Sequence, residues 1–304
     1  MSVAGEGTIV YHLGEYLDAN HAVVGVDSLA MRYGLSVFEG IRAYRQPNGR
    51  IMPFMLEPHL RRLRTSLQLM CLPDPGVDDI PAILAELIAR NGFAEDVYIR
   101  PSVHAINSGD LNLAPECGLT VHICQMGRKK WLETDSGMKA TISAWHKQSH
   151  SSFPSSAKCV AAYAGPFMAA TLAKNAGFDV PLLLNQHGYV TEAPTSALFL
   201  VKGGQLIHPP ATDGVLPSVT AFALCELATQ LRINVKEQHI RIEDIFSADE
   251  ALLCGTGLEI ASIKSLDNRV IRLFDSRPVT RRLTHAYFEL VRGQNMINGD
   301  RYGI

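Results

Sequence analysis

Residues 151–163 read Ser151-Ser-Phe-Pro-Ser-Ser-Ala-Lys158-Cys-Val-Ala-Ala-Tyr163, and Tyr189-Val-Thr-Glu192 follows downstream. Lys158 lies among small and apolar residues, whereas a surface lysine usually has polar neighbours. Burial disfavours the ammonium form and lowers the pKa of a lysine, and Schiff-base chemistry with an aldehyde requires the neutral amine. On spacing alone, however, the pattern favours a lysine at the start of a helix beside a Pro-Ser turn.

The segment around Lys158 resembles the catalytic-lysine region of the class IV (fold-type IV) pyridoxal-phosphate aminotransferases, especially the branched-chain amino acid aminotransferases. The resemblance implies that Lys158 is the Schiff-base lysine and that pyridoxal 5′-phosphate is the cofactor. It also implies that Tyr163 lies near the cofactor oxygen and lines the substrate pocket, and that Glu192 faces the pyridine nitrogen. The similarity runs from about Tyr33 to the C-terminal helix, which is nearly the whole chain.

A second string, Arg32-Tyr-Gly-Leu-Ser-Val-Phe-Glu-Gly-Ile-Arg42, resembles the branched-chain motif at identical spacing, and Tyr98-Ile-Arg-Pro101 also matches. The resemblance implies that Tyr33 and Phe38 line an apolar side-chain pocket. It implies further that Arg100 pairs with the distal carboxylate of glutamate, the amino donor. The alternative is that the two aromatics belong to the core and that Arg100 is a surface charge. The agreement of three motifs favours the pocket.

Two junctions in the second half of the chain suit an anion. Pro217–Thr220 opens a helix, where free backbone N–H groups and hydroxyls are available. Gly255-Thr-Gly257 follows a buried strand and allows close backbone approach. Taken alone, each signal is weak, because a serine before a helix is usually only an N-cap. In the family both places contact the cofactor phosphate, which implies cofactor binding by Ser218, Val219, Thr220 and Thr256, and a substrate carboxylate near Thr256 and Gly257.

Two departures from the family pattern concern the cofactor. Met55 stands where relatives carry an arginine that grips the phosphate, and Ala193-Pro-Thr-Ser-Ala197 replaces a Gly/Ser-rich string that ends in Glu-Asn. A bidentate Arg–phosphate contact is among the stronger polar interactions. We therefore expect looser cofactor binding than in relatives, unless Arg62, Arg64 or Lys147 supplies the missing charge.

The predicted fold is α+β and has two domains. Residues 1–126 form a small α/β domain, residues 127–137 an interdomain loop, and residues 138–304 a larger, β-rich cofactor-binding domain with the pseudo-barrel of fold-type IV enzymes. Strands at 97–103 and 118–124 are expected to pair. The spacing of apolar residues and the helix-end signals predict helices at about 161–176, from the segment 216–220 to about 231, and at about 279–292.

Composition excludes several other classes of protein. The 304-residue chain has a formal net charge of −2 and no basic run denser than Arg61-Arg-Leu-Arg64, so no nucleic-acid or membrane partner is expected. The six cysteines form neither a C-x-x-C pair nor a metal-ligand spacing, which indicates reduced thiols and no metal. Neither a signal-peptide pattern at Met1–Gly7 nor an apolar run near the ~20 residues of a membrane span is visible. We expect a cytoplasmic protein.

The resemblance implies amino transfer between a branched-chain or other apolar amino acid and 2-oxoglutarate. It also implies a homodimer, with the cofactor between the domains and the partner's small domain closing the pocket. Two alternatives remain. One is another class IV activity, such as an aminodeoxychorismate lyase, a D-amino acid transaminase or a specialised biosynthetic aminotransferase. The other is a catalytically impaired relative, which Met55 favours and the retention of Lys158 and Glu192 disfavours.

Overall fold

The computed structural model describes residues 7–294, which form two compact units. Within that range the first unit holds residues 7–127, 157–161 and 291–294, and the second holds 128–156 and 162–290. The segment around Lys158 thus groups with the first unit, although the predicted boundaries place it with the second. The start of the chain, where no signal peptide is expected, lies outside the described residues. None of the helices within 7–294 is both long enough and apolar enough to cross a membrane.

The first unit is built on a seven-stranded sheet whose pairings are antiparallel, in the order β2-β1-β7-β6-β4-β5, with β3 paired to β6. The long pairing of β6 with β7 confirms the predicted strand pair. The strands are β1 (Ile9–His12), β2 (Glu15–Asp18), β3 (Ser36–Phe38), β4 (Ile41–Arg45), β5 (Ile51–Pro53), β6 (Val97–Ala105) and β7 (Cys117–Gln125), and the helices are α1 (Leu29–Tyr33), α2 (Leu56–Leu69) and α3 (Ile80–Asn91).

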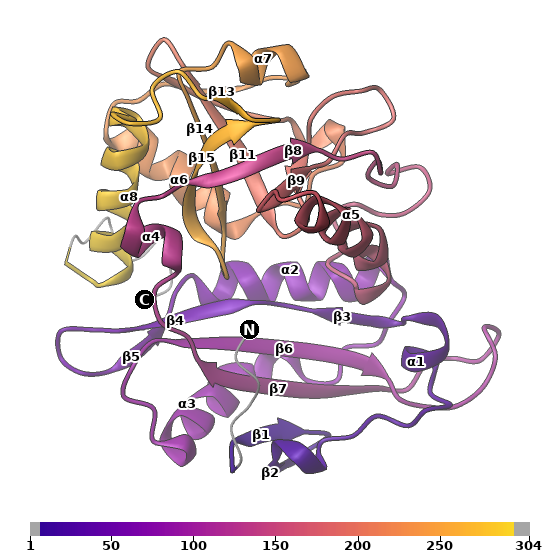
Figure 1. Ribbon diagram of the computed structural model, residues 1–304. Helices are drawn as coiled ribbons and strands as arrows, with labels where there is room; N and C mark the ends of the chain where they lie inside the picture. Colours follow the sequence, from indigo (N-terminus) through magenta and orange to yellow (C-terminus); the bar gives the residue numbers. More distant parts are fainter. Residues whose placement is uncertain (1–6, 295–304) are drawn as a thin grey trace. The chain divides into compact units, whose positions relative to one another are not determined.

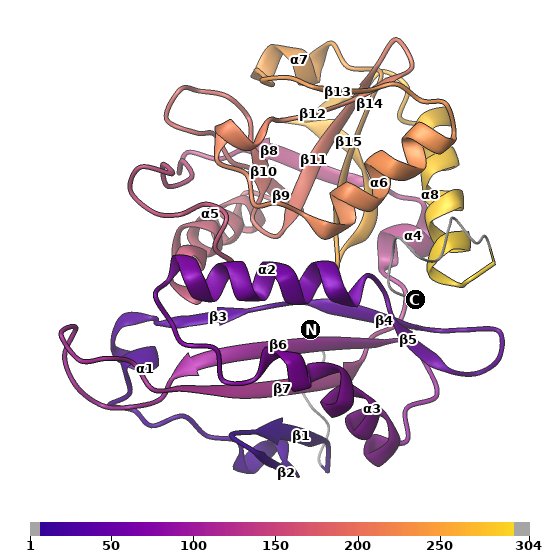
Figure 2. The ribbon, with the colours of Figure 1, turned by 180° about the vertical axis from the view of Figure 1, so that it is seen from behind.

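The two faces of this sheet differ in character. Side chains alternate between the faces of a strand, and along β6 the odd-numbered residues Val97, Ile99 and Val103 are wholly buried. Figure 2 shows α2 and α3 on one face of the sheet. Their leucine and isoleucine stripes bury that face. Arg100, which is half-buried, points to the opposite face.

The second unit is built on a nine-stranded mixed sheet in the order β13-β12-β11-β14-β15-β8-β9, with β10 on β11 and β16 on β15. All of β14 is buried, and α6 packs against it (Figure 1). The strands are β8 (Met138–Ile142), β9 (Val180–Leu182), β10 (Glu192–Ala193), β11 (Ser196–Lys202), β12 (Gln205–His208), β13 (Val235–Glu237), β14 (Glu250–Gly255), β15 (Glu259–Leu266) and β16 (Arg269–Val270). The helices are α4 (Lys130–Thr134), α5 (Ala164–Asn175), α6 (Val219–Gln230), α7 (Ile242–Phe246) and α8 (Pro278–Val291).

The three helices predicted in the second half of the chain are all present. Helices α5, α6 and α8 lie where periodicity predicts them, and Gly177 after α5 has the positive φ of 84° that suits glycine. The segment at 127–137, expected to be a loop, contains α4. Asp79 occupies the N-cap position of α3, but its side chain makes no capping hydrogen bond.

Candidate active site

The backbone of Lys158 is held by the first unit. The N–H of Phe38 donates to the Lys158 carbonyl at 3.0 Å, and Val37 forms an antiparallel bridge with Cys159. The N–H of Lys158 donates to the hydroxyl of Ser66 in α2, also at 3.0 Å. The lysine segment therefore extends the edge of β3 like one more strand, and both backbone polar groups of Lys158 are satisfied.

Strand alternation then decides where the amine lies. Because Cys159 pairs with Val37, Lys158 projects to the other face, the one that carries Phe38 and Arg100. Its Nζ lies 4.7 Å from the centre of the Phe38 ring, and the guanidinium carbon of Arg100 lies 3.9 Å from the same centre. The amine of Lys158 and the guanidinium of Arg100 therefore both lie over the ring of Phe38.

The environment of Lys158 favours a neutral amine. Burial lowers the pKa of Lys158 from 10.5 to about 7; the positive charges of Arg62 and Arg100 act in the same direction, and Glu39 opposes them. A substantial fraction of the amine is therefore unprotonated at neutral pH. This is the form that attacks a carbonyl carbon.

A buried polar network lies on the α2 side of the sheet. Glu39 is fully buried and accepts two hydrogen bonds from Arg62, Nε to Oε1 at 2.6 Å and Nη2 to Oε2 at 2.8 Å. The Nδ1 of His59 lies 2.8 Å from Oε2 of the same carboxylate. Burial alone would raise the pKa of Glu39, but Arg62 and His59 lower it to about 2. Burial lowers the pKa of His59, so His59 is the neutral donor in this network.

This network makes folding stability depend on pH. The unfolded chain takes up a proton on Glu39 near its ordinary pKa of 4.5, but the folded chain does so only near 2. The stabilising contribution of Glu39 is therefore complete above pH 4.5 and is lost as the pH falls from 4.5 towards 2. We expect urea unfolding to show a stability advantage of the native chain over Glu39→Gln/Arg62→Met that shrinks across this window. An advantage that stays constant from pH 6 to pH 3 would contradict the assignment.

Glu192, the acid expected to face the pyridine nitrogen, lies in the second unit. It is half-buried at the start of β10, where its carboxylate forms an ion pair with Lys147. The N–H of Leu216 approaches both carboxylate oxygens, at 3.3 and 3.4 Å. These contacts with Lys147 and Leu216 fix the orientation of the Glu192 carboxylate.

The two junctions expected to bind an anion are both in the second unit. Ser218 is the N-cap of α6, and its hydroxyl accepts from the N–H of Ala221. The backbone N–H groups of Val219 and Thr220 lie in the first turn of α6. No preceding turn of the helix provides carbonyl groups to accept hydrogen bonds from them. This geometry suits a phosphate.

Thr256 and Gly257 are the central residues of a turn between β14 and β15, closed by the N–H of Leu258 donating to Gly255 at 3.1 Å. A Cβ on Gly255 would come within 2.9 Å of the Thr195 carbonyl, so glycine is required there. The atypical stretch at 193–197 thus packs directly against this turn.

The remaining predicted pocket residues occupy less restrained positions. Tyr33 ends α1 and is partly exposed, with the guanidinium of Arg32 5.1 Å from its ring centre. Tyr163 is half-buried at the junction between a short 3-10 turn and α5. Each unit thus brings its own residues together, with Lys158, Phe38 and Arg100 in the first, and Glu192 and the α6 N-terminus in the second.

The departures noted in the sequence have structural counterparts. Met55 is fully buried, with the left-handed φ of 52°, immediately before α2. The three cations considered as substitutes each pair with an acid of this chain: Arg62 with Glu39, Arg64 with Glu57 and Asp78, and Lys147 with Glu192. Each of these positive charges is therefore already paired with a carboxylate. This weakens the expectation that one of them replaces the missing arginine as a phosphate ligand.

Sequence reasoning missed His59 and Ser66, and it considered Arg62 only as a possible source of charge for the phosphate. His59, Arg62 and Ser66 recur at i, i+3 and i+7 along α2 and form a polar stripe beside its leucines. Glu39 was quoted only as part of a motif. Residues three and four apart share a helix face. The spacing of these polar residues therefore predicts a polar stripe on α2.

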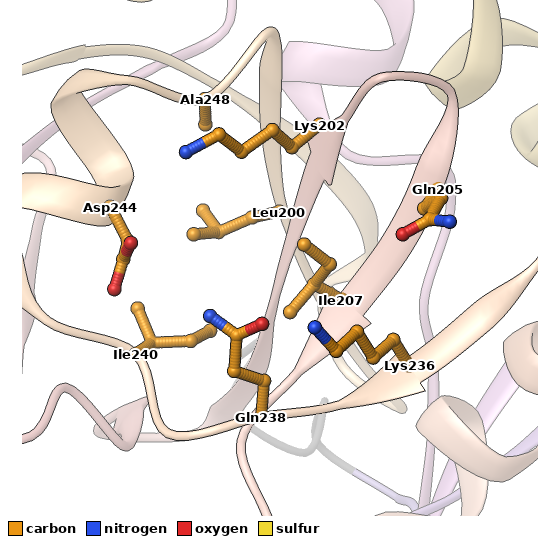
Figure 3. Close-up of a pocket in the computed structure, with 9 residues that line it drawn as sticks. All are labelled: Leu200, Lys202, Gln205, Ile207, Lys236, Gln238, Ile240, Asp244 and Ala248. Carbon is orange, nitrogen blue, oxygen red and sulfur yellow. The ribbon is translucent and has the colours of Figure 1, made fainter.

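A separate concavity of about 260 Å³ lies in the second unit beside β11, β12, β13 and α7 (Figure 3). Lysine and glutamine side chains surround apolar ones there. Its lining comprises Leu200, Lys202, Gln205, Ile207, Lys236, Gln238, Ile240, Asp244 and Ala248. It includes none of the predicted site residues, so it is distinct from the groups described above.

Comparison with known proteins gives a consistent result. The model of the family described as Amino-transferase class IV matches residues 36–266. A branched-chain-amino-acid aminotransferase of Salmonella typhimurium is 32% identical over 94% of this chain and 93% of its own. A crystal structure of the branched-chain aminotransferase from Thermoproteus uzoniensis with norvaline superposes with a TM-score of 0.91 at 30% identity, covering 97% and 98% of the two chains.

A further crystal structure shows a T.th. branched-chain amino acid aminotransferase with pyridoxamine 5′-phosphate. It gives a TM-score of 0.91 at 27% identity and covers 97% of each chain. These matches extend over both units. They confirm the predicted fold class and the resemblance on which the expected cofactor depends.

Proposed function

This chain belongs to the class IV aminotransferases, and on that premise we propose that it moves an amino group between a branched-chain or other apolar amino acid and 2-oxoglutarate. The observation that carries the proposal is the amine of Lys158, which is desolvated, has its pKa lowered to about 7, and lies on Phe38 beside Arg100. The names of the relatives support the apolar substrate.

Class IV aminotransferases use pyridoxal 5′-phosphate, and the described residues fit it. When bound, that cofactor supplies an electron sink for charge at the substrate α-carbon. We propose that Nζ of Lys158 holds it covalently and, once released, moves the proton of the substrate α-carbon. Glu192 pairs with the ring nitrogen, supported by its contacts with Lys147 and Leu216. Tyr163 lies near the cofactor oxygen, and the phosphate is held by Ser218, Val219, Thr220 and Thr256.

Substrate recognition is assigned to a second group of residues. We propose that Tyr33, Phe38 and Tyr163 contact an apolar side chain, and that Thr256 and Gly257 lie near the substrate carboxylate. Arg100 pairs with the distal carboxylate of glutamate. Its stacking on Phe38 supports this role, because the ring holds the guanidinium without neutralising it.

The absence of an arginine at Met55 leads to a specific prediction. Met55→Arg is expected to tighten binding of pyridoxal 5′-phosphate by at least about tenfold, because a charge-assisted hydrogen bond to phosphate contributes on the order of 1.5–3 kcal/mol. Met55→Leu keeps the volume and adds no donor, so it should bind as the native chain does. The measurement is a fluorescence titration of cofactor-free protein. Equal affinity in the native and Met55→Arg chains would contradict the prediction.

A second candidate function follows from the same departures. Met55 and the stretch at 193–197 favour a specialised class IV activity, such as aminodeoxychorismate lyase or D-amino acid transamination, or an impaired relative. A coupled assay with leucine, glutamate, D-alanine and aminodeoxychorismate, together with the absorption spectrum after cofactor addition, separates these. Turnover of leucine with 2-oxoglutarate supports the proposed function. No spectral change on addition of cofactor would refute it.

We also propose a homodimer. Helix α5 carries three large exposed apolar side chains, Phe167, Met168 and Leu172, with exposures of 72%, 42% and 53%. Met168 and Leu172 are four residues apart and share a helix face. Apolar surface of this kind is normally covered by a partner. Light scattering should give twice the 33.3 kDa of the chain, and a monomeric mass would contradict the proposal.

The cellular setting is proposed on independent grounds. None of the six cysteines, all of which lie within residues 7–294, forms a disulfide, which supports a reducing compartment such as the cytoplasm. The net charge of −2 supports a protein without a nucleic-acid or membrane partner. Fractionation of cells and a gel-shift assay test these two statements.

A further inference from the structure

We propose that Ser66, a buried serine of α2, is a positioning residue for Lys158. The hydroxyl of Ser66 accepts a hydrogen bond from the Lys158 N–H at 3.0 Å and donates to the Arg62 carbonyl at 2.8 Å. Ser66 is fully buried. The proposal rests on the proposed function only in taking Lys158 as the lysine that binds the cofactor.

Ser66 belongs to a closed ring of contacts around the lysine. From Ser66 the ring passes to Lys158, whose carbonyl accepts from Phe38 at 3.0 Å. Glu39 follows Phe38 in the chain and pairs with Arg62, whose carbonyl accepts from Ser66. Every step is a hydrogen bond of 2.8–3.0 Å, an ion pair or a covalent bond. Both the N–H and the carbonyl of Lys158 are therefore held in place.

The neighbouring residue shows what a serine or threonine does in a helix without this role. Thr65 donates to the carbonyl of Arg61 at 3.0 Å, is exposed, and thus makes only the bond to the preceding turn that is common in helices. Ser66 makes the same bond and in addition binds the reactive lysine. Thr171 and Thr229, which are both exposed, also bond four residues back, so a threonine in a helix can make the bond that Ser66 makes to Arg62.

The physical consequence concerns the amine. With its backbone anchored, Lys158 projects onto the Phe38 face, where it is desolvated. Removing the acceptor leaves the Lys158 N–H without its buried partner, and the segment gains freedom to move towards water. The pKa of the amine should then rise towards that of an ordinary lysine, because desolvation is the largest cause of its lowering.

The experiment compares Ser66→Ala with Ser66→Thr and Thr65→Ala in the full-length chain. Acetylation of Lys158 by acetic anhydride, followed by peptide mass spectrometry across pH 5–11 in cofactor-free protein, reports the amine pKa. In the loaded enzyme, kcat and KM for the amino acid are measured separately. Ser66→Ala should raise the amine pKa by at least about half a unit and lower kcat about tenfold with KM little changed. Thr65→Ala should match the native chain. Ser66→Thr keeps the hydroxyl but adds a methyl to a fully buried site, so its amine pKa and kcat should lie closer to the native values than those of Ser66→Ala.

A stability control separates positioning from general loosening. Ile83→Val removes one buried methyl from α3, which carries no part of the ring around Lys158. If Ile83→Val reproduces both changes, or if Ser66→Ala leaves both the amine pKa and kcat at native values, the proposal fails. Should pyridoxal 5′-phosphate attach to a residue other than Lys158, the proposed function fails, yet the comparison of amine pKa in cofactor-free protein still tests Ser66.

Discussion

Replacing Lys158 by alanine is expected to lower kcat for amino transfer by at least about 10⁴-fold, because one side chain both holds the cofactor and moves the proton. The variant should fold normally, since the anchoring bonds of Lys158 involve its backbone, which alanine retains. The coupled assay with leucine and 2-oxoglutarate measures the rate. Borohydride reduction followed by peptide mass spectrometry shows whether the cofactor is attached.

Lys174→Ala is the matched control, because Lys174 is an exposed lysine of α5 and lacks the buried setting of Lys158. It should retain native activity and the native site of attachment. Residual activity of Lys158→Ala within about tenfold of the native enzyme would contradict the assignment. Loss of a lysine that holds the cofactor and moves the proton should lower kcat far more than that.

Arg62→Met should lower the free energy of unfolding by about 3–5 kcal/mol, because it leaves the fully buried Glu39 carboxylate without its counter-ion. Arg62 makes two hydrogen bonds to that carboxylate, and methionine can make neither. Urea unfolding at pH 7, followed by circular dichroism, measures the change.

Two further variants sharpen this second result. Glu39→Gln combined with Arg62→Met removes the buried charge along with its partner and should recover part of the loss. Arg61→Met changes an exposed arginine on the same helix and should stay within about 0.5 kcal/mol of the native chain. Equal changes in the free energy of unfolding for Arg61→Met and Arg62→Met would show that the ion pair between Arg62 and Glu39 does not stabilise the fold.

Local patterns in the sequence sufficed for much of the fold. The hairpin between β11 and β12 turns at Gly203 and Gly204, which both have the positive φ that glycine tolerates. Helix α6 begins after Ser218 because serine caps a helix well. Such features depend on residues a few positions apart, so they can be predicted without knowledge of the rest of the chain.

The candidate site was predictable only in part. The spacing of residues around Lys158 by itself favoured an ordinary lysine at the start of a helix, and only the family resemblance indicated a reactive amine. In the structure, burial lowers the pKa of Lys158. The lack of an arginine at Met55 was equally visible. That Met55 is buried with a left-handed backbone was not, because the conformation depends on how the chain enters α2.

By itself, the sequence determined the strand and helix pattern, the family, and a lysine suited to carbonyl chemistry. Only the tertiary structure decided which of three similar arginines in α2 pairs with a buried acid, because that partner, Glu39, lies 23 residues away from Arg62. It likewise joined Lys158 to Ser66 across 92 residues and Lys147 to Glu192 across 45. Contacts at such separations form only when the entropy of closing long loops is offset by packing of the whole core, and no local period in the sequence records that outcome.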